Sequence, residues 1–253
     1  MEGHLKQLRL KTFIQNYGAF AQDAAQENRS YEQFLLALAQ QETAQRDLNS
    51  QRQRIKGARF SIIKELADFD FSAVPKLNKQ RLLTLAQGEY IARKEPIILV
   101  GNPGLGKTHI ATGLGMAACR QRERVRFYNA ASLVNELILA QEETRLEKVI
   151  ATALRHRPVL SVAERLIVLD ELGFIPFSAV GAQLVFQFVA ALYERVAIII
   201  TTNLKFADWP QIFGDERLTL ALLDRLTHRA HIIEFVGESW RFRQRMQREQ
   251  GDG

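Results

Sequence analysis

A chain of 253 residues, 47% hydrophobic and 25% charged, has the composition of an ordinary soluble protein with a large buried core. It has no apolar stretch near the roughly 20 residues of a membrane-spanning helix, and its start lacks the apolar segment of a secretory signal. We therefore expect a cytoplasmic protein without a membrane partner. A single cysteine excludes an internal disulfide and a cysteine-based zinc cluster, and the net charge of +6 favours a polyanionic partner.

Residues 1–60 are predicted to form a small all-helical N-terminal domain that binds DNA or a partner. Apolar residues in the range 5–17 recur at helical spacing, and Gly18 is expected to end or bend this helix. Ser30 and Gln33 have the spacing of a capping box at the start of a second amphipathic helix. The chain then becomes basic, and four candidate DNA contacts lie there: Arg52, Arg54, Lys56 and Arg59. A solvated helix face would have the same composition, so both interpretations stay open.

Residues 61–94 are predicted to be a linker, with a helical segment over 77–92, that leads into a larger domain. Phe69 and Phe71 in this linker have two interpretations. They pack against an adenine ring, or they anchor the linker on the domain surface, which is the commoner role of such aromatics. The larger domain spans residues 95–253 and ends in a short basic tail with Arg241, Arg243, Arg245 and Arg248.

In the larger domain, short apolar runs rich in β-branched residues alternate with helical segments. Strands that are apolar throughout are buried on both faces, so this alternation predicts an α/β fold with a parallel sheet. The five expected strands are 97–100, 125–129, 166–169, 197–201 and 231–235. The expected helices are 109–118, 131–141, 146–157, 182–194 and 215–226. Cys119 is expected to be a small buried residue on the helix that follows the first strand.

Residues 101–108 read GNPGLGKT, which matches the phosphate-binding pattern G-x-x-x-x-G-K-[ST] between an apolar strand and a helix. Glycines allow successive backbone N–H groups to face phosphate oxygens, and the helix N-terminus adds partial positive charge. Lys107 is expected to reach the β- and γ-phosphates, and the Thr108 hydroxyl to ligate Mg²⁺. The sequence therefore predicts a nucleoside triphosphate site. The residues predicted to bind ATP are Gly101, Asn102, Pro103, Gly104, Leu105, Gly106, Lys107, Thr108 and His109.

Two carboxylates, Asp170 and Glu171, directly follow the apolar run 166–169. Ligands of open α/β sheets bind at the carboxyl ends of the strands. Asp170 is therefore expected to hold Mg²⁺, and Glu171 to polarise an attacking water. An acid at the position of Glu171 favours water over a small molecule as the phosphoryl acceptor, so hydrolysis is preferred to a P-loop kinase reaction.

Two further polar residues are candidates for catalysis. Asn203 follows the fourth strand, where it would orient the attacking water or sense the γ-phosphate, although a turn or helix cap is the simpler alternative. Arg225 precedes the fifth strand, where it would stabilise transition-state charge on a neighbouring subunit's γ-phosphate. A surface ion pair with Asp224 or Glu216 is equally compatible with the spacing.

Segments along almost the whole chain resemble the IstB-type transposition helper ATPases of bacterial insertion sequences, which are AAA+ proteins close to the DnaC-type helicase loaders. In the larger domain they are GNPGLGKTHIA, LIVLDELG, ITTN, FGDERLTLALLDRLTHRAHIIEF and GESWR. In the N-terminal part they are LRLKTF, SYEQFLLALAQQE and QRQRIKGARFSIIKELADFDF. The resemblance implies an α/β P-loop AAA+ ATPase domain with a parallel five-stranded sheet, preceded by a small all-helical domain.

The resemblance also implies residue roles. Lys107 and Thr108 would be the Walker A residues, Asp170 and Glu171 the Walker B residues, and Asn203 the first sensor. Arg225 becomes the leading arginine-finger candidate, ahead of Arg229 and Arg217. Arg241 falls where related loaders carry a second sensor, but the chain ends too early for a full helical lid, and the stretch 157–165 is slightly longer than is usual in the family.

The function that the resemblance implies is ATP- and Mg²⁺-dependent self-assembly on double-stranded DNA, followed by recruitment and stimulation of a transposase. The expected assembly is a homo-oligomer with ATP sites at its subunit interfaces. A DnaC-like replicative helicase loader is the alternative, and a P-loop kinase for a small molecule is a third hypothesis that needs neither the basic helix nor Arg225.

Overall fold

The computed structural model describes residues 1–154 and 164–237. The chain forms two compact units, Met1–Gln53 (unit 1) and Arg54–Gly253 (unit 2). The predicted domain limits at residues 60 and 94 stay predictions. The basic tail with Arg241, and the stretch 157–163 in front of the third strand, lie outside the described residues.

Unit 1 is helical, with α1 (Glu2–Gln7), α2 (Lys11–Gln26) and the first part of α3 (Tyr31–Ala58). Helix α2 continues through Gly18, so the first alternative, a helix end at this glycine, is wrong, and the second, a bend, stays a prediction. The capping box at the start of α3 is confirmed. The backbone N–H of Gln33 donates to Ser30 Oγ at 3.3 Å, and the backbone N–H of Ser30 donates to Gln33 Oε1 at 3.0 Å.

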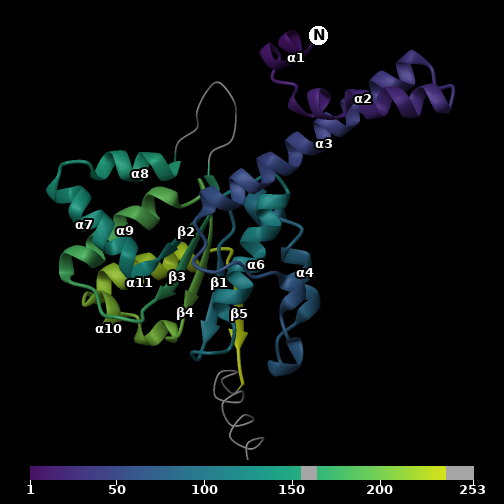
Figure 1. The fold of residues 1–253 in the computed structure, drawn as a ribbon. Coiled ribbons are helices and arrows are strands. Elements are labelled where there is room, and N and C mark those ends of the chain that lie inside the picture. The colour runs from purple at the N-terminus through teal and green to yellow at the C-terminus, as the bar shows by residue number, and fades with distance from the viewer. Residues whose placement is uncertain (155–163, 238–253) are drawn as a thin grey trace, which may run out of the picture. The chain divides into compact units, whose positions relative to one another are not determined.

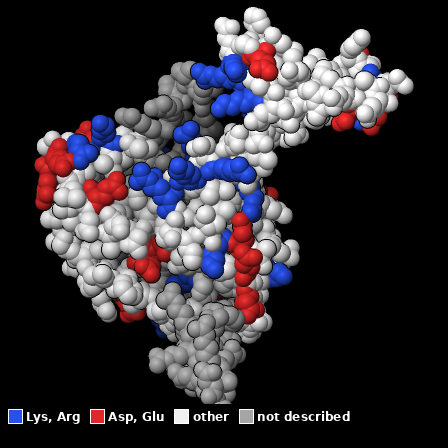
Figure 2. Space-filling model, viewed as in Figure 1, with Lys and Arg blue, Asp and Glu red and all other residues white. Residues whose placement is uncertain are grey.

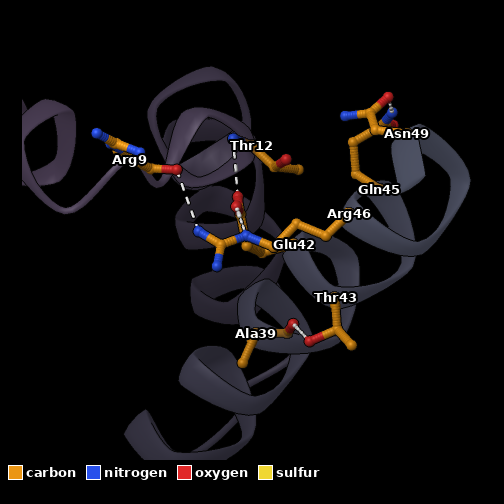
Figure 3. A network of polar contacts seen from close by, with 8 residues as sticks. All are labelled: Arg9, Thr12, Ala39, Glu42, Thr43, Gln45, Arg46 and Asn49. Atoms are coloured by element: carbon orange, nitrogen blue, oxygen red, sulfur yellow. Dashed lines mark hydrogen bonds and ion pairs between the residues drawn. The ribbon is translucent and has the colours of Figure 1, made fainter. Parts of the chain in front are cut away.

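A buried carboxylate joins the helices of unit 1 (Figure 3). Leu10 precedes α2 and offers no capping side chain, and Glu42 on α3 takes that role by accepting the Thr12 N–H at 2.9 Å. Arg46 donates to Glu42 Oε1 at 2.7 Å and to the Arg9 carbonyl at 3.1 Å. Burial works to raise the pKa of Glu42, but the hydrogen bonds from Arg46 and Thr12 outweigh it and hold the pKa below its ordinary value. The carboxylate therefore completes the N-terminus of α2 from another helix.

Unit 2 is built on the predicted parallel sheet, with strand order β2-β3-β4-β1-β5. The strands are β1 (Ile97–Gly101), β2 (Arg124–Asn129), β3 (Glu164–Leu172), β4 (Ala197–Thr202) and β5 (His231–Phe235). All four neighbouring pairs are parallel, and all five strands overlap the segments that were predicted as strands. Strand β3 extends beyond its apolar run and includes both Asp170 and Glu171.

Helices cover both faces of this sheet. Those that lead into it are η1 (Leu66–Asp68), η2 (Phe71–Ala73), α4 (Lys79–Leu85) and α5 (Glu89–Arg93). Those that follow β1 are α6 (Lys107–Arg120), α7 (Ala130–Glu142), α8 (Leu146–Leu154), α9 (Ala179–Leu192), η3 (Phe206–Asp208), α10 (Pro210–Phe213) and α11 (Glu216–Thr227). The helical segment expected over 77–92 consists of two short helices separated by Gly88, whose φ is +85°.

The core has one layer on each face of the sheet because successive strand residues point to opposite sides. Ile97 and Leu99 pack with α6 and the segment that precedes β1, whereas Ile98 packs with α7, α9 and α11. Figure 1 shows α6 and α4 on one side of the strands and α7, α9 and α11 on the other. Cys119 is fully buried in the first layer, as expected. No helix within the described ranges is long and apolar enough to cross a membrane.

Candidate functional site

A cleft of about 810 Å³ lies at the carboxyl ends of the central strands of unit 2. It brings together residues that the sequence predicted separately from the glycine-rich loop, β3 and β4. Its polar lining includes Lys107, Thr108, His109, Asn129, Asp170, Glu171, Thr201 and Asn203. Parallel strands place their carboxyl ends at one edge, and ligands of open α/β sheets bind there.

The loop between β1 and α6 has a backbone that requires glycine. Gly104 and Gly106 have φ values of +82° and +85°, in the left-handed region that favours glycine. A Cβ atom on Gly106 would lie 2.5 Å from Phe69 Cε2, so a side chain is also excluded by contact. Helix α6 begins at Lys107, and no side chain caps its N-terminus. Its first-turn N–H groups are therefore available to an anion in the cleft.

The Lys107 ammonium group folds back onto this loop. It donates to the carbonyl oxygens of Gly101 at 2.5 Å and Asn102 at 2.8 Å, and the residue is 9% exposed. Burial lowers the pKa of Lys107 to about 8, and the nearby carboxylates of Asp170 and Glu171 only partly oppose this shift. A phosphate group would thus meet a desolvated lysine that is already inside the site.

Two hydroxyl groups converge on one oxygen of Asp170. Thr108 Oγ1 donates to Asp170 Oδ1 at 2.9 Å, and Thr201 Oγ1 donates to the same oxygen at 2.6 Å. Asp170 is 4% exposed, and burial raises the pKa of its carboxyl group above the ordinary value, although both hydrogen bonds oppose the shift. A buried carboxylate beside a threonine hydroxyl is the oxygen-donor set that Mg²⁺ prefers, so these residues fit the metal.

A bulge in β3 presents Glu171. Leu169 pairs with Ile200 and Leu172 with Thr202, so β3 has one more residue than β4 over this interval. Glu171 takes up the extra length with a φ of +60°, and its N–H donates to Thr201 Oγ1 at 2.9 Å. The Thr201 hydroxyl therefore fixes both acidic residues, accepting from the Glu171 backbone and donating to the Asp170 side chain.

The Glu171 carboxylate is itself held by Asn129, whose Nδ2 donates to Glu171 Oε2 at 2.9 Å. Asn129 Oδ1 also accepts the N–H groups of Ala131 and Ser132 at the start of α7. Neither Asn129 nor Thr201 was predicted from the sequence as a site residue. The available signal was a polar residue at the end of each strand that flanks β3, but the sequence did not reveal which strands are neighbours.

Asn203 and Phe69 also line the cleft. Asn203 is half-buried directly after β4, so the structure places it beside the predicted ATP and Mg²⁺ residues. Phe69 is buried, and its ring centroid lies 4.9 Å from that of Phe71 and 5.2 Å from that of His109. Phe69 packs in the core and so anchors the linker; because it also lines the cleft, packing against an adenine ring stays a prediction.

Arg225 does not line this cleft. It lies on α11 beside a separate cavity of about 290 Å³, which Arg229 also lines. Its guanidinium donates to the Ala221 carbonyl at 3.0 Å and stands 5.0 Å from the centroid of the Phe186 ring. Within the described ranges it forms no ion pair with Asp224 or Glu216. Arg217, the third candidate, is exposed on α11.

Comparison with known proteins agrees with this geometry. Residues 3–248 match the family described as IstB-like ATP binding protein. The chain is 35% identical over 245 residues to a Pseudomonas aeruginosa protein described as the ATP-binding protein of insertion sequence IS21, covering 97% of this chain and 89% of the relative. It is 34% identical to the corresponding protein of insertion sequence IS5376 from Geobacillus stearothermophilus, covering 96% and 94%.

Among solved structures, the DnaC helicase loader superposes with a TM-score of 0.52 and 20% identity over 62% of this chain and 88% of that chain. A structural likeness at such low sequence identity shows a shared fold and nothing further. The fold is that of an AAA+ ATPase domain, as predicted.

Proposed function

From the premise that this chain belongs to the IstB-like ATP-binding family and is an AAA+ ATPase, we propose that it assembles on double-stranded DNA with ATP and recruits a transposase. The observation that carries the proposal is the single cleft in which Lys107, Thr108, Asp170 and Glu171 meet, in a chain whose relatives belong to insertion sequences. The alternative, a DnaC-like replicative helicase loader, is supported by a likeness of fold alone.

The residues of the cleft have distinct roles in this proposal. The loop amides and the α6 N-terminus bind the phosphate chain, and Lys107 exchanges its contacts with Gly101 and Asn102 for phosphate oxygens. Thr108 and Asp170 hold Mg²⁺, which when bound neutralises developing charge on the phosphates.

Two further residues act on the attacking water in this proposal. Glu171 accepts its proton, and Asn203 orients it at the tip of β4.

We infer that the functional form is a homo-oligomer with ATP at its subunit interfaces. Arg225 lies beside a cavity other than the nucleotide cleft, so it would act on the nucleotide of a neighbouring subunit. In this structure the guanidinium packs on the Phe186 ring and donates to the Ala221 carbonyl of its own helix, so it would exchange that hydrogen bond for the neighbour's phosphate. Arg229 and Arg217 are the other candidates for this role.

Double-stranded DNA as the polymer partner is supported by the net charge of +6 and by exposed Arg52, Lys56 and Arg59. Arg54, by contrast, donates to the Cys119 carbonyl at 2.9 Å within unit 2, which favours a structural role. Contacts to phosphates predict binding with little sequence preference that weakens steeply with salt. A protein that acts on DNA in a bacterial cell would work in the cytoplasm.

The test is ATP-dependent assembly on DNA, followed by capture of a transposase from an insertion sequence that encodes a relative of this chain. Lys107→Ala should abolish ATP binding and assembly, while Lys76→Ala, which removes an exposed lysine, should leave both unchanged. Glu171→Gln should bind ATP, hydrolyse it poorly and accumulate on DNA. Assembly by Lys107→Ala at the level of the unaltered protein would refute the nucleotide site, and capture of a replicative helicase instead of the transposase would favour the loader.

A mixing experiment tests the arginine finger. Arg225→Ala and Lys107→Ala subunits should each be poorly active alone, because one lacks the finger and the other lacks the nucleotide. Mixed oligomers should regain hydrolysis at those interfaces that pair an intact Lys107 with an intact Arg225. Full activity of Arg225→Ala alone in the assembled state would exclude this arginine.

A further inference from the structure

The edge of the sheet in unit 2 carries a cluster of basic side chains that the nucleotide site does not use. We call it the basic edge, and it comprises Lys56, Arg59, Arg124, Arg126 and Arg165. Lys56 belongs to the last turn of α3, Arg59 follows it, Arg124 and Arg126 belong to β2, and Arg165 lies at the start of β3. All except the half-buried Arg126 are exposed. Figure 2 shows Lys and Arg side chains in a band over the region where Figure 1 has the end of α3 and β2.

Packing holds the end of α3 against the edge strand. Arg126 Nη1 donates to the Gly57 carbonyl at 3.3 Å, and the ring centroids of Phe60 and Phe127 lie 6.0 Å apart in an edge-to-face contact. Gly115 on α6 makes room for Phe60, because a Cβ atom there would lie 2.8 Å from the Phe60 ring. Segments that are far apart in the sequence thus present their charges on one rigid surface.

The charges on this surface are available to a partner. Within the described ranges, neither Lys56, Arg59 nor Arg124 forms an ion pair or a side-chain hydrogen bond. The nearby Glu123 is already engaged, since Arg165 Nε lies 3.6 Å from its carboxylate. Arg126 is half-buried, and its guanidinium stands 5.3 Å from the centroid of the Tyr128 ring, which keeps its orientation fixed.

We propose that the basic edge is the surface along which the phosphate backbone of double-stranded DNA binds unit 2, an inference that rests on the proposed function. It extends the DNA contacts beyond the helix α3 region to the sheet, with Arg124 and Arg126 as contacts of the edge strand. Guanidinium and ammonium groups on a fixed surface match a row of phosphates, which specifies position and not sequence. Binding here leaves the nucleotide cleft open, since none of these five residues lines it.

The experiment compares two triple variants that each remove three positive charges. Lys56→Gln/Arg59→Gln/Arg124→Gln alters the basic edge, and Lys76→Gln/Lys79→Gln/Arg81→Gln is the control from the segment that ends in α4. Binding to a fluorescent duplex is measured with a non-hydrolysable ATP analogue between about 50 and 200 mM salt. ATP binding and thermal unfolding of each variant show that the nucleotide site and the fold persist.

The basic-edge variant should bind DNA at least about tenfold more weakly, and its plot of log affinity against log salt should become shallower by about 0.9 for each phosphate that is no longer neutralised. The control should keep the slope of the unaltered protein. Equal slopes and affinities for the two variants would overturn the basic edge while leaving DNA binding in place. Loss of transposase capture with unchanged DNA affinity would identify the face as a protein interface and equally overturn the proposal. An unaltered protein that binds no duplex at the lowest salt would refute the proposed function itself.

Discussion

The side-chain amide of Asn129 holds the Glu171 carboxylate across two neighbouring strands, with Nδ2 2.9 Å from Oε2. The same side chain caps α7 through its other atom, Oδ1. Asn129 therefore links the Glu171 carboxylate to the end of β2 and to the start of α7. The contact occupies one oxygen of the carboxylate that we propose to act on the attacking water, so we expect it to restrain hydrolysis.

Asn129→Ser should raise ATP turnover in the absence of DNA several-fold. Serine is a good helix N-cap but is too short to reach Glu171, so the substitution separates the two functions of Asn129. Steady-state phosphate release measures turnover, and a thermal melt checks that the α7 cap persists. Unchanged turnover in a stable variant would show that the contact does not restrain Glu171.

Thr201→Val should destabilise unit 2 by about 1–3 kcal/mol, because it leaves the Glu171 N–H and Asp170 Oδ1 without the hydroxyl that now serves both. Valine has nearly the same shape, so the packing of the site changes little. Thr201→Ser is the matched control and should retain most of the stability. Urea unfolding gives both values, and equal midpoints for the two variants would argue against the hydroxyl.

ATP binding should take up a proton above pH 8. The pKa of Lys107 is lowered to about 8 by burial, so its side chain is largely neutral above that pH in the nucleotide-free protein. The triphosphate stabilises the charged form, which raises this pKa and makes ATP affinity fall as pH rises through about 8 to 9. Calorimetry at pH 8.5 in buffers of different ionisation enthalpy measures the uptake. Binding at pH 8.5 without any proton uptake would contradict a lowered pKa for Lys107.

Unit 1 should lose stability in acid through Glu42. Its pKa is held below the ordinary 4.5, so the carboxylate stabilises the folded state above that pH, and the contribution disappears as pH falls through the lower folded value. Hydrogen-exchange protection of the Thr12 amide in the full chain should therefore drop below about pH 4.5. Glu42→Gln should have lower protection that no longer changes in this range, whereas Asp23→Asn, a control on exposed α2 surface, should behave like the unaltered chain.

Much of this fold could be predicted because its central strands, such as β1 and β4, are apolar on both faces, which marks them in the sequence. The glycine-rich loop and the pair of acidic residues could also be predicted from the sequence, since the residues of each motif are contiguous. Sheet order is not local, and this is why Asn129, 42 residues before Glu171, escaped notice. Gly18 does not end α2, because an interior glycine weakens a helix by only about 1 kcal/mol. Contacts such as the Glu42 cap on α2 offset this cost.

The two carboxylate oxygens of Asp170 have different surroundings. Oδ1 accepts from Thr108 at the start of α6 and from Thr201 on β4, so it ties a helix and a strand to β3. No described residue donates to Oδ2, which keeps its lone pairs for a ligand. Asparagine could reproduce the tie with its carbonyl oxygen, but it would bring an amide donor and no negative charge to the second position. Loss of the carboxylate at this residue should thus leave the scaffold assembled and remove its attraction for a cation.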